Sequence, residues 1–268
     1  MTTRTDRPHD RVRVEYRSDR VAWVVLDPEE GSANSFTTLV VDAMREGVEA
    51  AAERARVVVL RGEGGFAVGA DLRHLREQAP GARSATVDDI VSASNDLVTA
   101  IRSAPALVVA AVTGVAAGGG FGFALACDLV VAHEEARFDA AYARIGLTPD
   151  NATPFFLARL LGPYRAREVL FAPDPLSARE AQDLGLVSAV FDGSPAAFDD
   201  DVAAFVAPFT RYPSSLVSET KALVDSALGT DLETHLGLER EAVVAASESD
   251  RFAEGLDAFF DRRDPDWA

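Results

Sequence analysis

The hydrophobic residues of this chain follow two spacings, which alternate along its first two thirds. A polar turn joins two short apolar-rich segments, which predicts a hairpin over 12–26. Further short apolar runs predict strands at 57–60, 107–112, 129–132 and 186–191. Between them, apolar residues recur at helical spacing and predict helices over 37–54, 88–102, 121–126, 154–161, 165–171 and 177–184. Alternating strands and helices are typical of an α/β fold.

The last part of the chain has helical spacing only. After Gly193, helices are predicted over 196–206, 214–228, 232–246 and 251–260. We therefore expect an α/β core over residues 1–192 and a helical region over residues 193–268. The first eleven residues are polar, without the apolar stretch of a secretory signal, and are expected to form a frayed tail.

Charge and cysteine content exclude several kinds of partner. The chain has 268 residues and a formal net charge of −17, which disfavours nucleic acid and anionic membranes. No segment reaches the roughly 18 apolar residues of a membrane span. The single cysteine, Cys127, lies in an apolar run, so we expect a buried side chain and a reducing, cytoplasmic location. No cluster of His, Cys and carboxylates has the spacing of a metal site, so no metal is expected.

Two glycine-rich loops share one design. The sequences GEGGFAVGADL at 62–72 and GVAAGGGFG at 114–122 each follow a predicted buried strand and lead toward a helix. Neither matches a nucleotide-binding motif. Unpaired amides at a helix N-terminus can stabilise negative charge on a carbonyl oxygen, and two of them form an oxyanion hole. Tight turns with close helix–strand packing are the alternative interpretation.

The loops also resemble those of a known family. FAVGADL at 66–72 and AAVTGVAAGGGFGFALACDLVVA at 110–132 are similar to the two signature segments of the crotonase superfamily, the enoyl-CoA hydratase/isomerase family. Further similar segments lie at 21–37, 136–150, 160–171, 177–191 and 252–265. The resemblance implies a crotonase (ClpP-like) spiral of β-β-α units with a helical C-terminal trimerisation region. The implied assembly is a homotrimer or a dimer of trimers.

The resemblance also implies a substrate and a set of contacts. Family members bind acyl-CoA thioesters and need no cofactor beyond the CoA moiety of the substrate. Their two oxyanion-hole amides fall on Ala70 and Gly119 of this sequence. Positions that contact CoA in the family fall on Phe66, Asp71 and Leu72, although Asp71 is equally suited to cap a helix.

The acidic positions of the family are changed in this sequence. The two glutamates of hydratases fall on Gly122 and Tyr142, which makes hydration by two carboxylates doubtful. Asp150, in GLTPDNAT, resembles the acidic position of isomerases of the family. The same position is the nucleophile of 4-chlorobenzoyl-CoA dehalogenase, whose activating histidine falls near Asn95. Without the resemblance, Asp150 is a residue of a pre-helix turn.

Several functions therefore remain open. The favoured one is an enoyl-CoA isomerase, acting on a double bond or a ring, with Asp150 as acid and base. The alternatives are a thioester hydrolase or dehalogenase with Asp150 as nucleophile, an atypical enoyl-CoA hydratase, and a non-catalytic acyl-CoA-binding protein. Gly118, Gly122, Tyr142 and Asn95 are expected at the acyl pocket, where Tyr142 either donates a hydrogen bond or is an ordinary half-buried aromatic. Lys221 and Arg262–Arg263 resemble positions that meet CoA phosphates, although surface charge is the commoner explanation.

Overall fold

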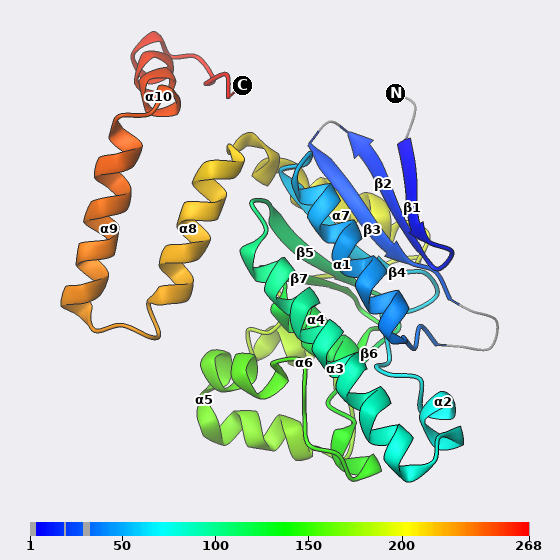
Figure 1. The fold of residues 1–268 in the computed structure, drawn as a ribbon. Coiled ribbons are helices and arrows are strands. Elements are labelled where there is room, and N and C mark those ends of the chain that lie inside the picture. The colour runs from blue at the N-terminus through cyan, green and yellow to red at the C-terminus, as the bar shows by residue number, and fades with distance from the viewer. Residues whose placement is uncertain (1–3, 19, 29–32, 268) are drawn as a thin grey trace.

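A seven-stranded sheet forms the centre of the molecule (Figure 1). The computed structural model describes residues 4–18, 20–28 and 33–267. Along the sheet the strands are β1 (Arg4–His9), β2 (Val12–Ser18), β3 (Val21–Leu26), β4 (Val57–Gly62), β5 (Leu107–Val112), β7 (Leu129–His133) and β10 (Ala189–Phe191). The first three pair antiparallel and the rest pair parallel, so the carboxyl ends of β4, β5 and β7 lie at one edge.

Both faces of this sheet are buried, which explains the continuous apolar runs. Alternate residues such as Val58 and Leu60 point toward α1 (Thr38–Ala52) and α3 (Pro80–Ser103). Their neighbours Val57 and Val59 point to the opposite face, where α7 (Phe198–Val206) packs with Phe198, Val202 and Val206. The first helix beyond residue 193 thus covers the sheet, and the division of the chain at residue 192 stays a prediction.

A second, three-stranded sheet consists of β6 (Val115–Ala117), β8 (Arg137–Asp139) and β9 (Leu176–Ser177). These strands have two or three residues each, too few to show a hydrophobic period, and the sequence did not predict them. The remaining core elements are α2 (Leu72–Glu77), α4 (Gly119–Ala126), the 3-10 helix η1 (Tyr142–Ile145), α5 (Thr153–Phe171) and α6 (Ala178–Asp183).

The frayed tail expected over the first eleven residues was wrong for residues 4–9, and residues 1–3 lie outside the described residues. Arg4–His9 forms β1, which pairs with β2 at the edge of the sheet. An edge strand needs backbone partners on one side only and does not need an apolar face, so polar residues are compatible with it. The helix boundaries also differ. α3 begins at Pro80. The two helices predicted over 154–161 and 165–171 are confirmed, because α5 is interrupted at Gly162, where φ is 73° and ψ is 164°.

The C-terminal helices stand apart from the sheet. Figure 1 shows α8 (Ser214–Ser226) and α9 (Leu232–Ser247) extending away from the core, followed by α10 (Asp250–Asp261). α8 is tied to the core by Lys221, whose Nζ lies 2.8 Å from Asp128 Oδ2 and donates to the carbonyl oxygens of Ile101, Ala104 and Ala106. None of the helices in the described ranges is both long enough and apolar enough to span a membrane.

Candidate active site

The two glycine-rich loops lie side by side at the carboxyl ends of β4 and β5. The amide of Ala67 donates to the carbonyl oxygen of Val115 at 3.2 Å, and the amide of Ala117 donates to that of Ala67 at 2.8 Å. Ala67 and Ala116 form a parallel bridge between the loops. Segments that are separate in the sequence therefore form one continuous backbone surface.

The three consecutive glycines are required for two reasons, backbone conformation and lack of space. Gly118 has φ 51° and ψ −124°, a conformation that residues with a Cβ rarely adopt. A Cβ on Gly119 would lie 2.5 Å from Nδ2 of Asn151, and a Cβ on Gly120 would lie 2.1 Å from the carbonyl oxygen of Ala67. The space that side chains at Gly119 and Gly120 would need is thus occupied by Asn151 and by the backbone of Ala67.

The amides of Ala70 and Gly119 are free to bind a ligand oxygen. Gly119 is the first residue of α4, so its amide has no acceptor within the helix. Both neighbours of Ala70 are hydrogen-bonded to Phe36. The amide of Phe36 donates to the carbonyl oxygen of Gly69, and the amide of Asp71 donates to the carbonyl oxygen of Phe36. Across the described residues, neither amide donates to an acceptor within the chain. Ala70 and Gly119 line the same pocket, as an oxyanion hole requires.

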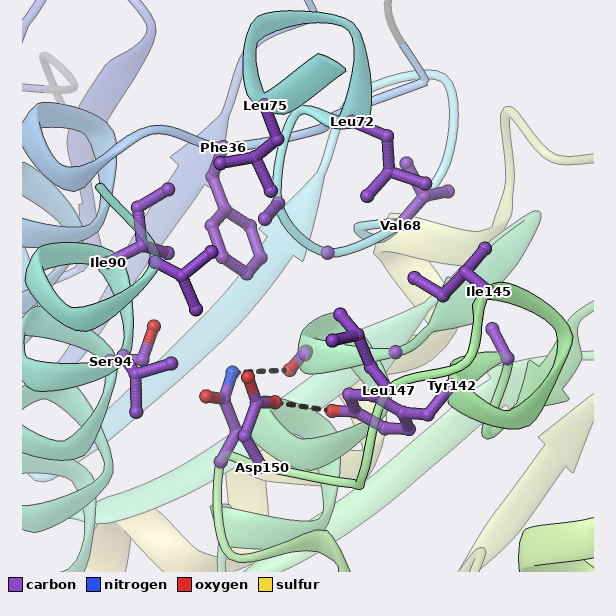
Figure 2. Close-up of a pocket in the computed structure, with 18 of the residues that line it drawn as sticks. Phe36, Val68, Leu72, Leu75, Ile90, Ser94, Tyr142, Ile145, Leu147 and Asp150 are labelled. Atoms are coloured by element: carbon purple, nitrogen blue, oxygen red, sulfur yellow. Dashed lines mark hydrogen bonds between the residues drawn. The ribbon is translucent and has the colours of Figure 1, made fainter. Parts of the chain in front are cut away.

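Asp150 and Tyr142 form a hydrogen-bonded pair of side chains in this pocket. The hydroxyl of Tyr142 donates to Oδ1 of Asp150 at 2.6 Å (Figure 2). Tyr142 is buried at the start of η1, and Asp150 is partly buried just before α5. Burial raises the pKa of the Asp150 carboxyl, while the hydrogen bond from Tyr142 opposes this shift. Among the residues that line the pocket, Asp150 is the single carboxylate.

The rest of the lining is mostly apolar. The cavity has a volume of about 280 Å³. Its apolar walls comprise Phe36, Val68, Leu72, Leu75, Val87, Ile90, Val91, Ile145 and Leu147. The charged side chain of Arg144 also lines it and is paired with Asp139. The pocket therefore suits a ligand with an uncharged apolar end and one oxygen that needs hydrogen-bond donors.

Two residues expected at the pocket lie elsewhere. Asn95 is exposed on α3, and its neighbour Ser94 lines the pocket in its place. Gly122 does not line the pocket, because the position that its Cβ would occupy points toward Asn151 and Thr153. A Cβ at Gly122 would lie 2.7 Å from the carbonyl oxygen of Asn151 and 2.8 Å from Oγ1 of Thr153. This position therefore has no room for a glutamate.

The residues expected to contact CoA have different surroundings. Asp71 caps α2, because its Oδ1 accepts hydrogen bonds from the amides of Arg73 at 2.9 Å and His74 at 3.3 Å. Leu72 is exposed at the pocket, and Phe66 is buried. The cap is thus confirmed, and CoA contact at these three residues stays a prediction.

Asn151 is a site residue that the sequence analysis did not single out. Its Nδ2 donates to the carbonyl oxygen of Gly119 at 3.2 Å, which ties the segment that carries Asp150 to the first turn of α4. Asn151 and Ala152 both have positive φ, 50° and 56°, and Asn is among the residues that tolerate this conformation best. The turn expected before the helix is therefore present and also positions the site.

The basic positions and the cysteine do not reach the pocket. Lys221 is buried against the carbonyl groups named above, and Arg263 pairs with Glu254 on α10. Cys127 is buried, and burial raises the pKa of its thiol. No group of three or more His, Cys, Asp or Glu side chains that could hold a metal occurs in the described part of the chain.

Comparison with known proteins shows the family of this chain. The family model described as enoyl-CoA hydratase/isomerase matches residues 17–268. The chain belongs to the enoyl-CoA hydratase/isomerase family. The family belongs to the crotonase superfamily, so the resemblance and the crotonase fold are both confirmed.

Relatives within the enoyl-CoA hydratase/isomerase family carry the names of different activities. The chain is 36% identical to a Rhodobacter capsulatus protein named "Probable enoyl-CoA hydratase", over 92% of this chain and 94% of that one. It is 32% identical to the 1,2-epoxyphenylacetyl-CoA isomerase of Escherichia coli, over 78% of this chain and 80% of that one. A crystal structure of an enoyl-CoA hydratase from Bacillus anthracis superposes with a TM-score of 0.87 at 27% identity, covering 96% of this chain and 99% of the other. Family membership supports an acyl-CoA enzyme and leaves its reaction open.

Proposed function

We propose that this protein is an acyl-CoA isomerase in which Asp150 moves a proton between two carbons of the acyl group. The observation that carries the proposal is the composition of the pocket. A single carboxylate, Asp150, lies in one pocket with the free amides of Ala70 and Gly119. The amides supply charge stabilisation and the carboxylate supplies proton transfer, which are the two needs of an enolate reaction.

The reaction would proceed in two steps. Asp150 accepts a proton from one acyl carbon while the thioester oxygen becomes an enolate oxygen, held by the amides of Ala70 and Gly119. Protonated Asp150 then returns that proton to a different carbon and the thioester carbonyl reforms. Atoms and charge balance without any second reactant, and the carboxylate is regenerated.

Hydration is less well supported, because it needs a base for water and an acid for the second proton. The pocket offers one carboxylate for both tasks. At the position where hydratases of the family have a glutamate, Gly122 faces Asn151 and leaves no space for a side chain. The apolar walls favour an uncharged acyl group, either an aliphatic chain or a ring.

Replacement of Asp150 by Asn tests the proposal. Turnover is measured by the absorbance of the conjugated thioester formed from a panel of β,γ-unsaturated acyl-CoA esters. We expect Asp150→Asn to lower kcat by about 10²–10⁴-fold, the usual contribution of a general acid–base group. Binding of a saturated CoA ester should be retained, because the amides and the apolar walls are unchanged.

The exposed Asp96 of α3 provides a matched control, since Asp96→Asn makes the same chemical change outside the pocket. Wild-type rates in Asp150→Asn would overturn the role. Binding without turnover of any ester by the wild-type protein would favour a non-catalytic acyl-CoA-binding protein.

A nucleophilic Asp150 would leave a different isotopic signature. Repeated turnovers in heavy-oxygen water would place label in the Asp150 carboxyl group, because hydrolysis of an ester to Asp150 returns an oxygen from water. Isomerisation in deuterium oxide instead exchanges hydrogen at the substrate carbons only. Label in Asp150 would replace the isomerase proposal by the hydrolase or dehalogenase.

We also propose that the C-terminal helices assemble the protein into a trimer. α9 has no buried residue, α10 buries Ala258 alone, and their exposed apolar residues include Leu232, Phe259 and Phe260. Such surfaces usually mark contacts between subunits. Light scattering coupled to size exclusion should give a multiple of three chains, whereas a monomer at micromolar concentration would contradict the proposal.

A further inference from the structure

Tyr142 is fixed in the pocket by its own backbone, independently of Asp150. Its amide donates to the carbonyl oxygen of Ala140 at 2.7 Å, and its carbonyl oxygen accepts from Leu147 at 3.1 Å. The residue before it, Ala141, has φ 60° and donates its amide to Oδ1 of Asp139 at 2.9 Å. The phenol is therefore positioned by the turn that carries it.

The hydroxyl of Tyr142 reaches one oxygen of Asp150. The distance from the hydroxyl to Oδ1 is 2.6 Å, which is typical of a hydrogen bond to a charged acceptor. Figure 2 shows the two side chains meeting inside the pocket, with Tyr142 from η1 and Asp150 from the loop that precedes α5. Among the described residues, the side-chain hydrogen bond to this carboxylate goes to Oδ1. The backbone amide of Asp150 also donates to the carboxylate.

Few other groups influence the carboxylate. The pocket residues of α2 and α3 are Leu72, Leu75, Val87, Ile90, Val91 and Ser94, none of which is charged. The glycine-rich loops present no titratable side chain there, and Arg144 of η1 is paired with Asp139. Burial opposes the charge of Asp150, and the Tyr142 hydrogen bond favours it. Burial and the charge of Asp150 both raise the pKa of Tyr142, so the phenol keeps its proton.

We propose that Tyr142 is the positioning residue of Asp150: it holds Oδ1, so that Oδ2 alone exchanges the proton with the acyl group. This inference rests on the proposed function. It adds that the orientation of the base and the pH at which it ionises both depend on a phenol that itself gives up no proton.

The test is Tyr142→Phe, which removes the hydroxyl and keeps the ring. A charge-assisted hydrogen bond favours the carboxylate by an amount that corresponds to about one pH unit or more. The acidic limb of kcat/KM, which rises as Asp150 loses its proton, should therefore move to higher pH by about one unit. The plateau kcat should fall roughly 10-fold because the carboxylate is less well oriented, while KM changes little.

Tyr164→Phe is the matched control, because Tyr164 is exposed on α5 and outside the pocket. It should leave the pH profile unchanged. A purely structural role for Tyr142 would lower activity equally at every pH and leave the limb in place, and that result would overturn the inference.

A measurement without substrate separates the inference from the proposed function. Carbon NMR of protein labelled at the aspartate carboxyls, with Asp150→Asn to assign the signal, reports the titration of Asp150 directly. Tyr142→Phe should raise its midpoint by the same one unit. If this shift occurs while wild-type protein isomerises no ester, the proposed function fails and the pairing stands. An unmoved midpoint refutes the pairing whatever the activity.

Discussion

Two walls of the pocket differ in what they present to a ligand: one presents backbone groups and the other presents side chains. The amide wall, residues 66–72 and 114–120, contributes N–H groups that are held where two loops pair with each other. The acid wall, residues 141–152, contributes the Tyr142 hydroxyl and the Asp150 carboxylate from irregular turns. A side-chain substitution can change the functional groups of the acid wall. On the amide wall the functional groups are backbone N–H groups, so a substitution there can only disturb their positions.

The difference lies in what each wall tolerates. On the amide wall, the space beside Gly119 and Gly120 is filled by other parts of the protein, so the backbone there accepts no side chain. On the acid wall, three alanine or asparagine residues adopt positive φ beside the functional groups: Ala141, Asn151 and Ala152. Such conformations cost about 1–3 kcal/mol each and are found where the surrounding structure fixes them. The surrounding structure therefore fixes the backbone on both sides of the segment that carries Tyr142 and Asp150.

Gly120→Ala should give the largest effect and tests the amide wall. The new Cβ would lie 2.1 Å from the carbonyl oxygen of Ala67, so the two loops must separate. We expect a loss of about 3 kcal/mol or more in the free energy of unfolding. For a chain of this size that corresponds to a fall in Tm of about 10 °C by calorimetry.

Gly81→Ala is the control for this change. Gly81 lies in the first turn of α3, and a Cβ there meets nothing within 4 Å. Its Tm should stay constant or rise slightly, because alanine is the better helix former. A Gly120→Ala protein as stable as Gly81→Ala would show that the amide wall is not sterically closed.

Gly122→Glu should give the next largest effect and asks whether an acid can be introduced beside the amide wall, on α4. The side chain would meet Asn151 at its first carbon, so we expect destabilisation of about 1–3 kcal/mol and no gain of enoyl-CoA hydration. Gly122→Ala should account for most of the loss, since the clash begins at Cβ. Hydration of a crotonyl-type thioester by a stable Gly122→Glu protein would mean that the wall adapts and that its chemistry can be changed there after all.

The spacing of apolar residues on α3 could have shown which of Ser94 and Asn95 faces the core. On α3 the buried residues Ile90, Ser94, Leu97 and Ile101 recur at helical spacing. This stripe predicts that Ser94 faces inward and that Asn95 does not, so the placement of Asn95 at the pocket could have been avoided. By contrast, β1 has no apolar pattern, because a strand at the edge of a sheet is held by backbone hydrogen bonds.

The contact between Tyr142 and Asp150 was beyond reach of the sequence. The two residues are eight positions apart in a segment without regular period. Ala141 and Ala152, which flank the segment, have positive φ, and alanine is not a residue that signals such a conformation. The resemblance to the family singled out both positions but related neither to the other.

By itself, the sequence determined the α/β alternation, the two glycine-rich loops and the absence of a carboxylate at Gly122. These follow from local rules, since burial sets a hydrophobic period and a missing side chain can be read directly. Only the tertiary structure decided that the protein fills the space beside these glycines, and that Asp150 reaches the pocket with Tyr142 bound to it. Those contacts depend on how loops that are distant in the chain pack against one another, and the spacing of hydrophobic residues in one segment does not predict this packing.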